Sequence, residues 1–97
     1  MYTTVRQYPS VGAGTFEQVV PRQQEIEAVL RGVPGFVSYQ MLRTGDGMTS
    51  VTVCQDQAGV EETNRAVARW IMQHIPTFMP TPPQVTAGEV VMAFAAQ

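Results

Sequence analysis

The tetrapeptide Thr44-Gly45-Asp46-Gly47 constrains the fold of this chain more than any other feature of the sequence. It lies between two runs, residues 36–43 and 48–55, that are rich in β-branched and aromatic side chains, which favour a pleated, half-buried surface. Its two glycines can adopt the positive φ angles that a tight hairpin turn requires. The pattern therefore predicts two neighbouring antiparallel strands in the middle of the chain.

A broken amphipathic helix is predicted before this hairpin. Thr15 and Gln18 have the spacing of a capping box, in which two side chains satisfy the free N–H groups at a helix start. Pro21 lacks a backbone N–H group and clashes with the preceding turn, so a continuous helix is not expected there. We expect a short first segment followed by a longer helical segment over residues 22–31.

A second helix is predicted after the hairpin. Asp56 is placed to cap its start, because a carboxylate there accepts from free backbone N–H groups. Pro76 ends the helical pattern. One face of this helix is expected to carry Val60, Val67, Ile71 and His74.

The two ends of the chain complete the pattern. Residues 2–8 have strand composition, and the three prolines in residues 77–83 predict an extended loop. Residues 84–95 are expected to contain the last strand, with residues 90–94 at its centre. The resulting βαββαβ order predicts an α+β, ferredoxin-like fold, a single domain over residues 1–97 with both helices on one face of a four-stranded antiparallel sheet.

Apolar side chains occupy both faces of the predicted strands. Phe36 and Leu42 share one face of their strand, while Val37 and Met41 share the other. Two helices cover only one of these faces, and a large bare apolar surface is unusual on a monomer. Charged residues make up 14% of the chain, below the roughly one quarter of a typical soluble domain. We therefore expect a homodimer that packs sheet against sheet.

The charge pattern and the apolar runs exclude several classes of partner. The net charge is −2 and the chain contains no Lys, so no basic surface for nucleic acid is expected. The apolar runs are too short to span a bilayer, which argues against a membrane partner. The first six residues lack a signal pattern, and the one cysteine, Cys54, allows no internal disulfide. A cytoplasmic location is the expectation.

The segment Val33-Pro34-Gly35-Phe36-Val37-Ser38-Tyr39, together with the order of the elements, resembles the antibiotic biosynthesis monooxygenase-like (ABM) group of proteins. The Ala-containing helix over residues 61–70, which ends in Trp70, is a second point of likeness. The resemblance covers most of the chain and implies a dimeric α/β barrel with a cleft between sheet and helices. Activities in the group include cofactor-independent oxygenation of polycyclic aromatics and haem degradation, so a shared fold does not fix the reaction.

The resemblance also implies roles for Asn64 and Trp70, because members of the group line their cleft with an Asn, a Trp and a His, Tyr or Arg. The haem-degrading members carry their Asn on the first strand, where this chain has threonines and a glutamine. In addition, His74 follows Trp70 by only one helical turn. We therefore do not expect haem ligation by His74. As a separate expectation, no cofactor is predicted.

Each candidate for catalysis has a structural alternative. His74 is predicted as a general base, the commonest role of a catalytic histidine, and Tyr39 is a second candidate for that base. The structural alternative for His74 is a hydrogen-bonded core or interface residue. Asn64 is predicted to steady a substrate anion, with capping or core hydrogen bonding as the alternative. Trp70 is predicted to stack on a flat substrate, with a core anchor as the alternative.

Four polar or aromatic residues recur at alternating positions of two predicted strands, namely Arg6, Tyr8, Tyr39 and Arg43. If these strands present the same face, the four side chains form a patch suited to an anionic or phenolic ligand. Ordinary polarity of a strand edge or an interface is the alternative. Cys54 is interpreted as a buried structural cysteine, since no base or cation accompanies it in sequence.

The sequence therefore predicts a dimeric protein that handles a small apolar or aromatic molecule. Its sharper form is a cofactor-independent monooxygenase with His74 and Asn64 as catalytic residues. The predicted substrate-binding residues are Trp70, Tyr39, Arg43 and Arg6. No metal site is expected, because one His and scattered carboxylates do not make a convincing ligand set. A non-catalytic ligand-binding or interaction module is the alternative.

Overall fold

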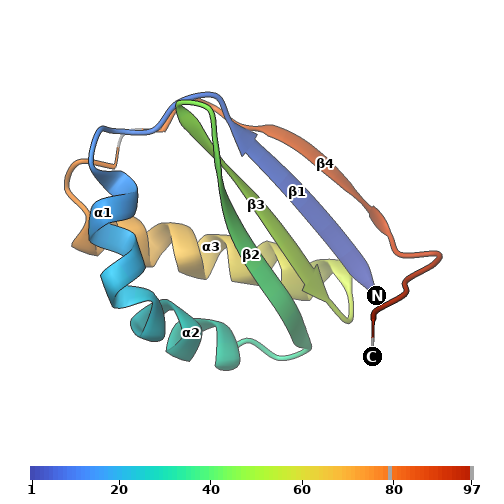
Figure 1. The fold of residues 1–97 in the computed structure, drawn as a ribbon. Helices are drawn as coiled ribbons and strands as arrows, with labels where there is room; N and C mark the ends of the chain where they lie inside the picture. The colour runs from blue at the N-terminus through green and yellow to red at the C-terminus, as the bar shows by residue number, and fades with distance from the viewer. Residues whose placement is uncertain (79, 97) are drawn as a thin grey trace.

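A computed structural model describes residues 1–78 and 80–96. All helices lie on one side of a four-stranded antiparallel sheet (Figure 1), which confirms the predicted ferredoxin-like α+β fold. Residue 79 of the predicted loop lies outside the described residues. The elements are β1 (Tyr2–Tyr8), α1 (Thr15–Val19), η1 (Val20–Arg22), α2 (Gln23–Arg31), β2 (Phe36–Thr44), β3 (Gly47–Cys54), α3 (Gln57–His74) and β4 (Gln84–Glu89).

The sheet has the order β2-β3-β1-β4, so β3 and β1 form its centre. Thr44 pairs with Gly47 across the β2–β3 turn, which leaves Gly45 and Asp46 as a two-residue loop. Gly45 has a φ of +61°, the left-handed conformation that the first central position of such a turn requires. The hairpin predicted from the tetrapeptide is confirmed.

The first helical region is broken at the predicted proline. Pro21 lies near the start of the 3₁₀ turn η1, which separates α1 from α2. The capping-box prediction is wrong, because Thr15 is already the first residue of α1 and Gly14 precedes it as the N-cap. The Thr15 hydroxyl donates backward to the Gly12 carbonyl oxygen at 2.6 Å.

The start of α3 follows the prediction. Asp56 is the N-cap, and its Oδ1 accepts from the Gly59 N–H at 2.8 Å. This bond satisfies one of the backbone donors that the first turn leaves free. The helix ends at His74, directly before Ile75 and Pro76.

The predicted centre of the last strand is wrong. β4 ends at Glu89, which pairs with Tyr2 at the start of β1. Beyond it the chain has no further length of β1 to pair with, and the Val90 N–H bonds to the Met1 carbonyl as the last such contact. Residues 90–94 therefore form no strand, despite their β-branched and aromatic composition. Val91 and Phe94 are each 88% exposed.

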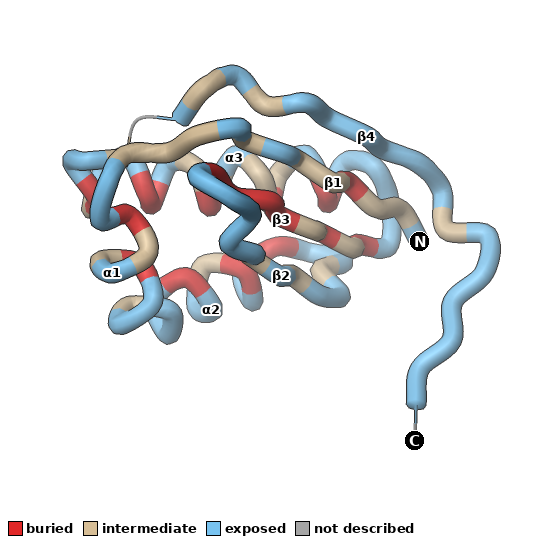
Figure 2. Tube along the Cα trace, turned by 45° about the horizontal axis from the view of Figure 1, so that its top comes forward, coloured by how far each residue is buried: buried red, intermediate tan, exposed pale blue. Residues whose placement is uncertain are grey.

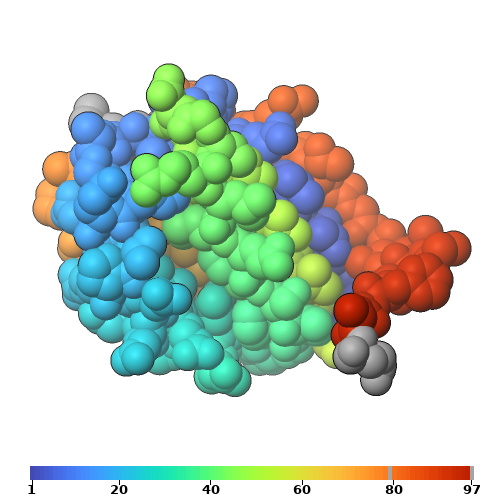
Figure 3. Space-filling view, viewed as in Figure 1, coloured from blue at the N-terminus to red at the C-terminus, as the bar shows by residue number. Residues whose placement is uncertain are grey.

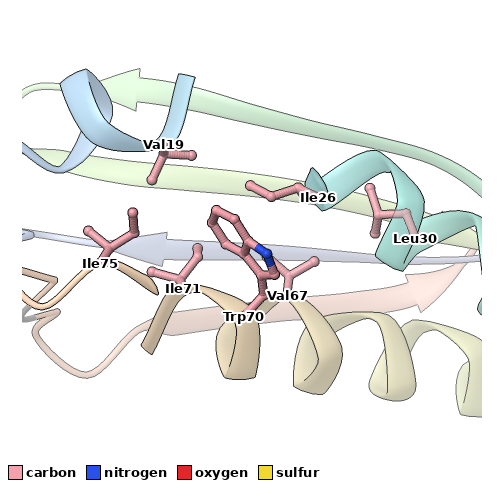
Figure 4. Packing of buried hydrophobic residues seen from close by; sticks show 7 residues of the cluster. All are labelled: Val19, Ile26, Leu30, Val67, Trp70, Ile71 and Ile75. Carbon is pink, nitrogen blue, oxygen red and sulfur yellow. The ribbon is translucent and has the colours of Figure 1, made fainter. Parts of the chain in front are cut away.

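The apolar core lies between α3 and the α1–η1–α2 segment. Figure 2 shows the buried positions along the inward sides of the helices and in β3. Figure 4 shows the Trp70 indole rising from α3 toward Ile26 and Val19. The full cluster is Val19, Ile26, Leu30, Val67, Trp70, Ile71 and Ile75.

The two faces of the sheet differ in character. Thr4, Ser50 and Thr52 are buried on the face that carries the helices, so this face is rich in hydroxyl groups. The outer face carries the alternate residues, including Val51 and the 41% exposed Leu42. The period-two geometry of the strands thus leaves a mixed outer face that no helix of the chain covers, on which a group of apolar side chains lies among threonines and glutamines.

Candidate functional site

A groove separates the α1–η1–α2 segment from the edge strand β2. It has a volume of about 1220 Å³ and is open to solvent, and Figure 3 shows the hollow beside the β2 atoms. We call it the α2–β2 groove. Its lining includes Phe16, Val19, Pro21, Ile26, Glu27, Leu30, Arg31, Phe36, Tyr39, Met41 and Arg43.

The groove exists because α2 packs on α3 and not closely on β2. The apolar face of α2 presents Ile26 and Leu30 to the core cluster around Trp70. The inner face of β2 then presents Tyr39 and Met41 across the gap, partly packed against the same cluster. The predicted break at Pro21 lets the segment bend around this space.

Tyr39 is a half-buried polar group of this groove. Burial raises the pKa of its phenol to about 12, and the neighbouring Tyr8 acts in the same direction. A hydrogen bond with Ser50 and the positive charge of Arg6 act in the opposite direction on this pKa. At neutral pH Tyr39 is therefore a hydrogen-bond donor and a poor general base.

Arg43 lies at the exposed mouth of the same groove. Its Cζ lies 4.6 Å from the centroid of the Phe16 ring, a distance typical of a cation–π contact. Its Nη2 lies 3.8 Å from the Glu17 carboxylate, at the long limit of an ion pair. The guanidinium thus lies against the Phe16 ring at the mouth of the groove.

Arg6 and Asn64 lie elsewhere, in a second groove between α3 and the β1–β4 edge. We call it the α3–β4 groove; its volume is about 370 Å³, and it shares none of the residues that line the α2–β2 groove. Asn64 Oδ1 accepts from the Thr52 hydroxyl at 3.2 Å, and Arg6 Nε donates to the Tyr8 hydroxyl at 3.2 Å. The lining is Tyr2, Thr4, Arg6, Gln57, Val60, Glu61, Asn64, Arg65, Ala68, Val85 and Ala87.

Trp70 and His74 form a third group, and neither lines either groove. Trp70 is only 7% exposed and belongs to the core cluster. The His74 ring stacks on the Trp70 ring with 4.6 Å between centroids. His74 Nδ1 lies 2.8 Å from the Trp70 carbonyl oxygen, within hydrogen-bond distance. Their predicted roles in binding and catalysis stay predictions.

The four-residue patch is therefore divided between two places. Arg6, Tyr8, Tyr39 and Arg43 do share the helix-bearing face of the sheet, as the alternation predicts. However, β3 separates β1 from β2, which puts Arg6 in one groove and Tyr39 with Arg43 in the other. Cys54 is fully buried, and its Sγ lies 3.4 Å from the Thr63 hydroxyl oxygen.

Sequence reasoning missed two features of these sites. The first is the role of Phe16 and Met41 as walls of the α2–β2 groove, because that groove is formed only when the helices pack on the sheet. The second is Thr4, a buried hydroxyl of the α3–β4 groove, whose strand position alone gave no sign of its surroundings. Within residues 1–78 and 80–96, no group of three or more His, Cys, Asp or Glu side chains is placed to hold a metal ion. No helix in that part of the chain is long and apolar enough to cross a membrane.

Comparison with protein-family models finds no match, and no curated protein matches the sequence. Solved structures do match across nearly the whole chain. A mutant of MhuD with two manganese protoporphyrin IX bound per active site matches with a TM-score of 0.71 and 18% identity, covering 99% of this chain and 100% of that chain. A monooxygenase of Streptomyces coelicolor in complex with nanaomycin D matches with a TM-score of 0.65 and 19% identity, covering 99% and 92%.

A further match is an antibiotic biosynthesis monooxygenase, with a TM-score of 0.66 and 13% identity over 95% of this chain and 100% of that chain. Identities this low are evidence about the fold and not about the reaction. The resemblance seen in the sequence is thereby confirmed at the level of architecture: this chain has the ABM-like, ferredoxin-like α+β fold.

Proposed function

We propose that the protein binds a small, flat, largely apolar molecule with an acidic hydroxyl group, a phenol or an enol, in the α2–β2 groove. The observation that carries the proposal is the pairing of apolar walls with two polar groups, Tyr39 and Arg43. Concave, mainly apolar sites with a few convergent polar groups are the usual form of small-molecule sites. Phe16 and Met41 supply flat or adaptable apolar surface on opposite sides of the groove.

The polar groups suit the ionised form of such a ligand. Tyr39 is protonated at neutral pH, as any phenol is, and its pKa of about 12 keeps the proton on it beside an acidic ligand, so it can donate a hydrogen bond to an oxyanion. Arg43 brings a permanent positive charge to the mouth. Both groups lower the pKa of the bound hydroxyl, whose proton passes to water at the open mouth of the groove.

The reaction proposed for that ligand is oxygenation without a cofactor. The bound phenolate or enolate supplies the electrons that reduce O₂, and a new C–O bond forms at the ring carbon. The resulting hydroperoxide loses one water molecule and leaves a carbonyl, so one substrate and one O₂ give one quinone and one H₂O. The Streptomyces coelicolor monooxygenase, whose structure contains nanaomycin D, supports a ligand of this chemical class.

Haem is not part of the proposal. MhuD has the same fold and binds manganese protoporphyrin IX. In this chain the one histidine, His74, does not line the α2–β2 groove and its Nδ1 lies against the Trp70 carbonyl. The groove therefore offers no histidine to ligate a haem iron, and the Tyr39 phenol, whose pKa is raised to about 12, is poorly suited to bind iron as a phenolate.

A binding module without turnover is the second candidate, and one observation favours it. Among the described residues, Glu27 supplies the carboxylate of the groove, and it is paired with Arg31 at 2.9 Å. Tyr39 is a poor base because its pKa is raised to about 12. No described side chain of the groove is therefore an obvious proton acceptor at neutral pH. Ligand binding without catalysis would need none.

Calorimetric titration with 1-naphthol and oxygen uptake with anthrone test the two candidates. We expect Tyr39→Phe and Arg43→Gln each to weaken 1-naphthol binding about tenfold, the loss typical of one charge-assisted hydrogen bond. Arg69→Gln, an exposed arginine of α3, is the control and should bind as the wild type does. Unchanged binding in both groove variants contradicts the proposed site. Binding without oxygen uptake above the protein-free rate identifies the binding module.

We also propose that a second copy of the chain covers the outer face of the sheet. Val5, Val51 and Leu42 lie on that face, opposite the helices. Apolar side chains grouped on an uncovered sheet face favour association with a second surface. Sedimentation should give twice the 10.6 kDa of one chain, and Val51→Glu should shift the protein to monomer. A stable wild-type monomer on dilution contradicts this assembly.

A further inference from the structure

The α3–β4 groove contains a buried hydroxyl with no partner. The Thr4 side chain is 5% exposed, and its Oγ1 has no hydrogen-bond partner among the described residues. Buried polar atoms in native proteins nearly always have a partner, because an unpaired one costs about 1–3 kcal/mol. Thr4 lines the groove, and because its Oγ1 is itself enclosed, a rotation about χ1 is needed before a ligand there can become the partner that the protein does not provide.

Two further side chains of the groove have donors to spare. Asn64 uses Oδ1 to accept from Thr52, which leaves its Nδ2 hydrogens for another acceptor. Arg6 uses Nε to donate to the Tyr8 hydroxyl, and no carboxylate among the described residues lies within ion-pair distance of it. Its two terminal nitrogens remain available. Arg6 and Asn64 therefore present free donors to one space and lack a shared acceptor, and the Thr4 hydroxyl joins them only by turning about χ1.

The remaining charges of the groove limit the ligand to one negative charge. Arg65 is already paired with Glu62 at 3.0 Å, so its charge is largely neutralised. Glu61 lies at the rim, where its Oε1 accepts from Gln57 at 3.3 Å, and its carboxylate disfavours a doubly charged anion. A planar carboxylate matches the fork of a guanidinium better than a tetrahedral anion does when only one arginine is available.

The other walls of the groove are apolar. They are formed by Val60 and Ala68 of α3 and by Val85 and Ala87 of β4. The volume of about 370 Å³ is near the lower end of the range for small-molecule sites, roughly 300–1,000 Å³. This combination suits a molecule with one carboxylate and a compact apolar body.

We propose that the α3–β4 groove is a second ligand site that takes a small monocarboxylate. Arg6 binds the carboxylate, Asn64 Nδ2 donates to it, the Thr4 side chain turns so that Oγ1 donates as well, and the apolar body lies against Val60 and Val85. The site is separate from the α2–β2 groove and does not depend on the function proposed there.

Benzoate is the probe, and its binding is followed in ¹H–¹⁵N NMR spectra of the full chain. We expect saturable shifts of the Asn64 side-chain amide and of the Thr4 and Arg6 backbone amides. Benzamide, which has the same shape without the charge, should produce shifts at least tenfold weaker. Shifts confined to residues of the α2–β2 groove such as Phe16 and Met41, or equal responses to the two probes, overturn the proposal.

Variants assign the binding to Arg6 and Asn64. Arg6→Gln should weaken benzoate binding at least tenfold, while Arg69→Gln, on the exposed side of α3, should leave it unchanged. Asn64→Asp keeps an acceptor for Thr52 and places a carboxylate in the groove, so it should abolish binding even if Arg6→Gln folds poorly. Wild-type affinity in Asn64→Asp overturns the proposal.

Discussion

Replacing Thr4 with valine tests the buried hydroxyl that has no hydrogen-bond partner. The substitution exchanges a hydroxyl for a methyl group of nearly the same shape at a position that is 5% exposed. The hydroxyl has no partner to lose, so the variant removes the cost of burying an unpaired polar group. That cost is about 1–3 kcal/mol. We therefore expect Thr4→Val to raise the free energy of unfolding by about 1–2 kcal/mol in the absence of any carboxylate ligand.

Thr52 provides a matched control, because it is the cross-strand partner of Thr4 in the centre of the same sheet. Its side chain is also fully buried, but its hydroxyl donates to Asn64 Oδ1. Thr52→Val removes that donor and leaves the Asn64 oxygen without it, so we expect a loss of about 1 kcal/mol. The two isosteric substitutions at neighbouring positions should thus change stability in opposite directions.

Urea unfolding followed by circular dichroism measures both variants. The wild type and the variants must be compared at one protein concentration, because association with a second copy would add to the apparent stability. For a domain of this size, 1 kcal/mol corresponds to a shift of about 4–8 °C in Tm. If Thr4→Val loses as much stability as Thr52→Val, the Thr4 hydroxyl has a partner and the case for a second site loses its main support.

The other predictions concern the turn, the core, the helix start and one ionisation. In Gly47→Ala the added Cβ would collide with the Tyr8 carbonyl oxygen. We therefore expect the free energy of unfolding in urea to fall by more than about 3 kcal/mol. A fall below about 1 kcal/mol contradicts the close approach of Gly47 to the Tyr8 backbone. Trp70→Ala should cost about 3–5 kcal/mol by the same assay, since the indole fills the core cluster; a neutral variant means that Trp70 is not a core residue. Asp56→Ala should cost about 1 kcal/mol through loss of the α3 N-cap, and Asp56→Asn should retain most of it. In absorbance titration at 295 nm, one tyrosine should ionise with a pKa of about 12, and Tyr39→Phe should lack that step. The pKa of Tyr39 in the folded state lies above the ordinary value of 10.0. The stabilisation that the folded state gains from the neutral phenol is therefore complete below pH 10 and is lost between about pH 10 and 12.

Local signals predicted most of the fold. The hairpin around Gly45 and the break at Pro21 depend on backbone preferences of a few residues, and the structure has both. The Asp56 cap is a contact between residues three apart, and it also forms as predicted. The strand predicted from composition at residues 90–94 is not formed. A strand needs a neighbour to pair with, and Tyr2, the first residue of β1, already pairs with Glu89.

The candidate sites depend on contacts that sequence spacing does not contain. Alternation along the strands placed Arg6 and Tyr39 on one face, but the position of β3 between their strands separated them. Helical spacing placed Asn64 and His74 on α3, yet Asn64 faces β3 through Thr52 while His74 stacks on Trp70. The α2–β2 groove itself follows from how α2 meets α3, which is a property of tertiary packing.

The place of Arg6 has a consequence for both grooves. Its guanidinium faces the α3–β4 groove, and its charge also lowers the pKa of Tyr39, which lines the α2–β2 groove. An anion seated beside Arg6 would weaken that influence and make the Tyr39 phenol still harder to ionise. By thermodynamic reciprocity, ionising Tyr39 would in turn weaken the binding of the anion beside Arg6. The charge of Arg6 would thus couple the two grooves without any movement of the backbone.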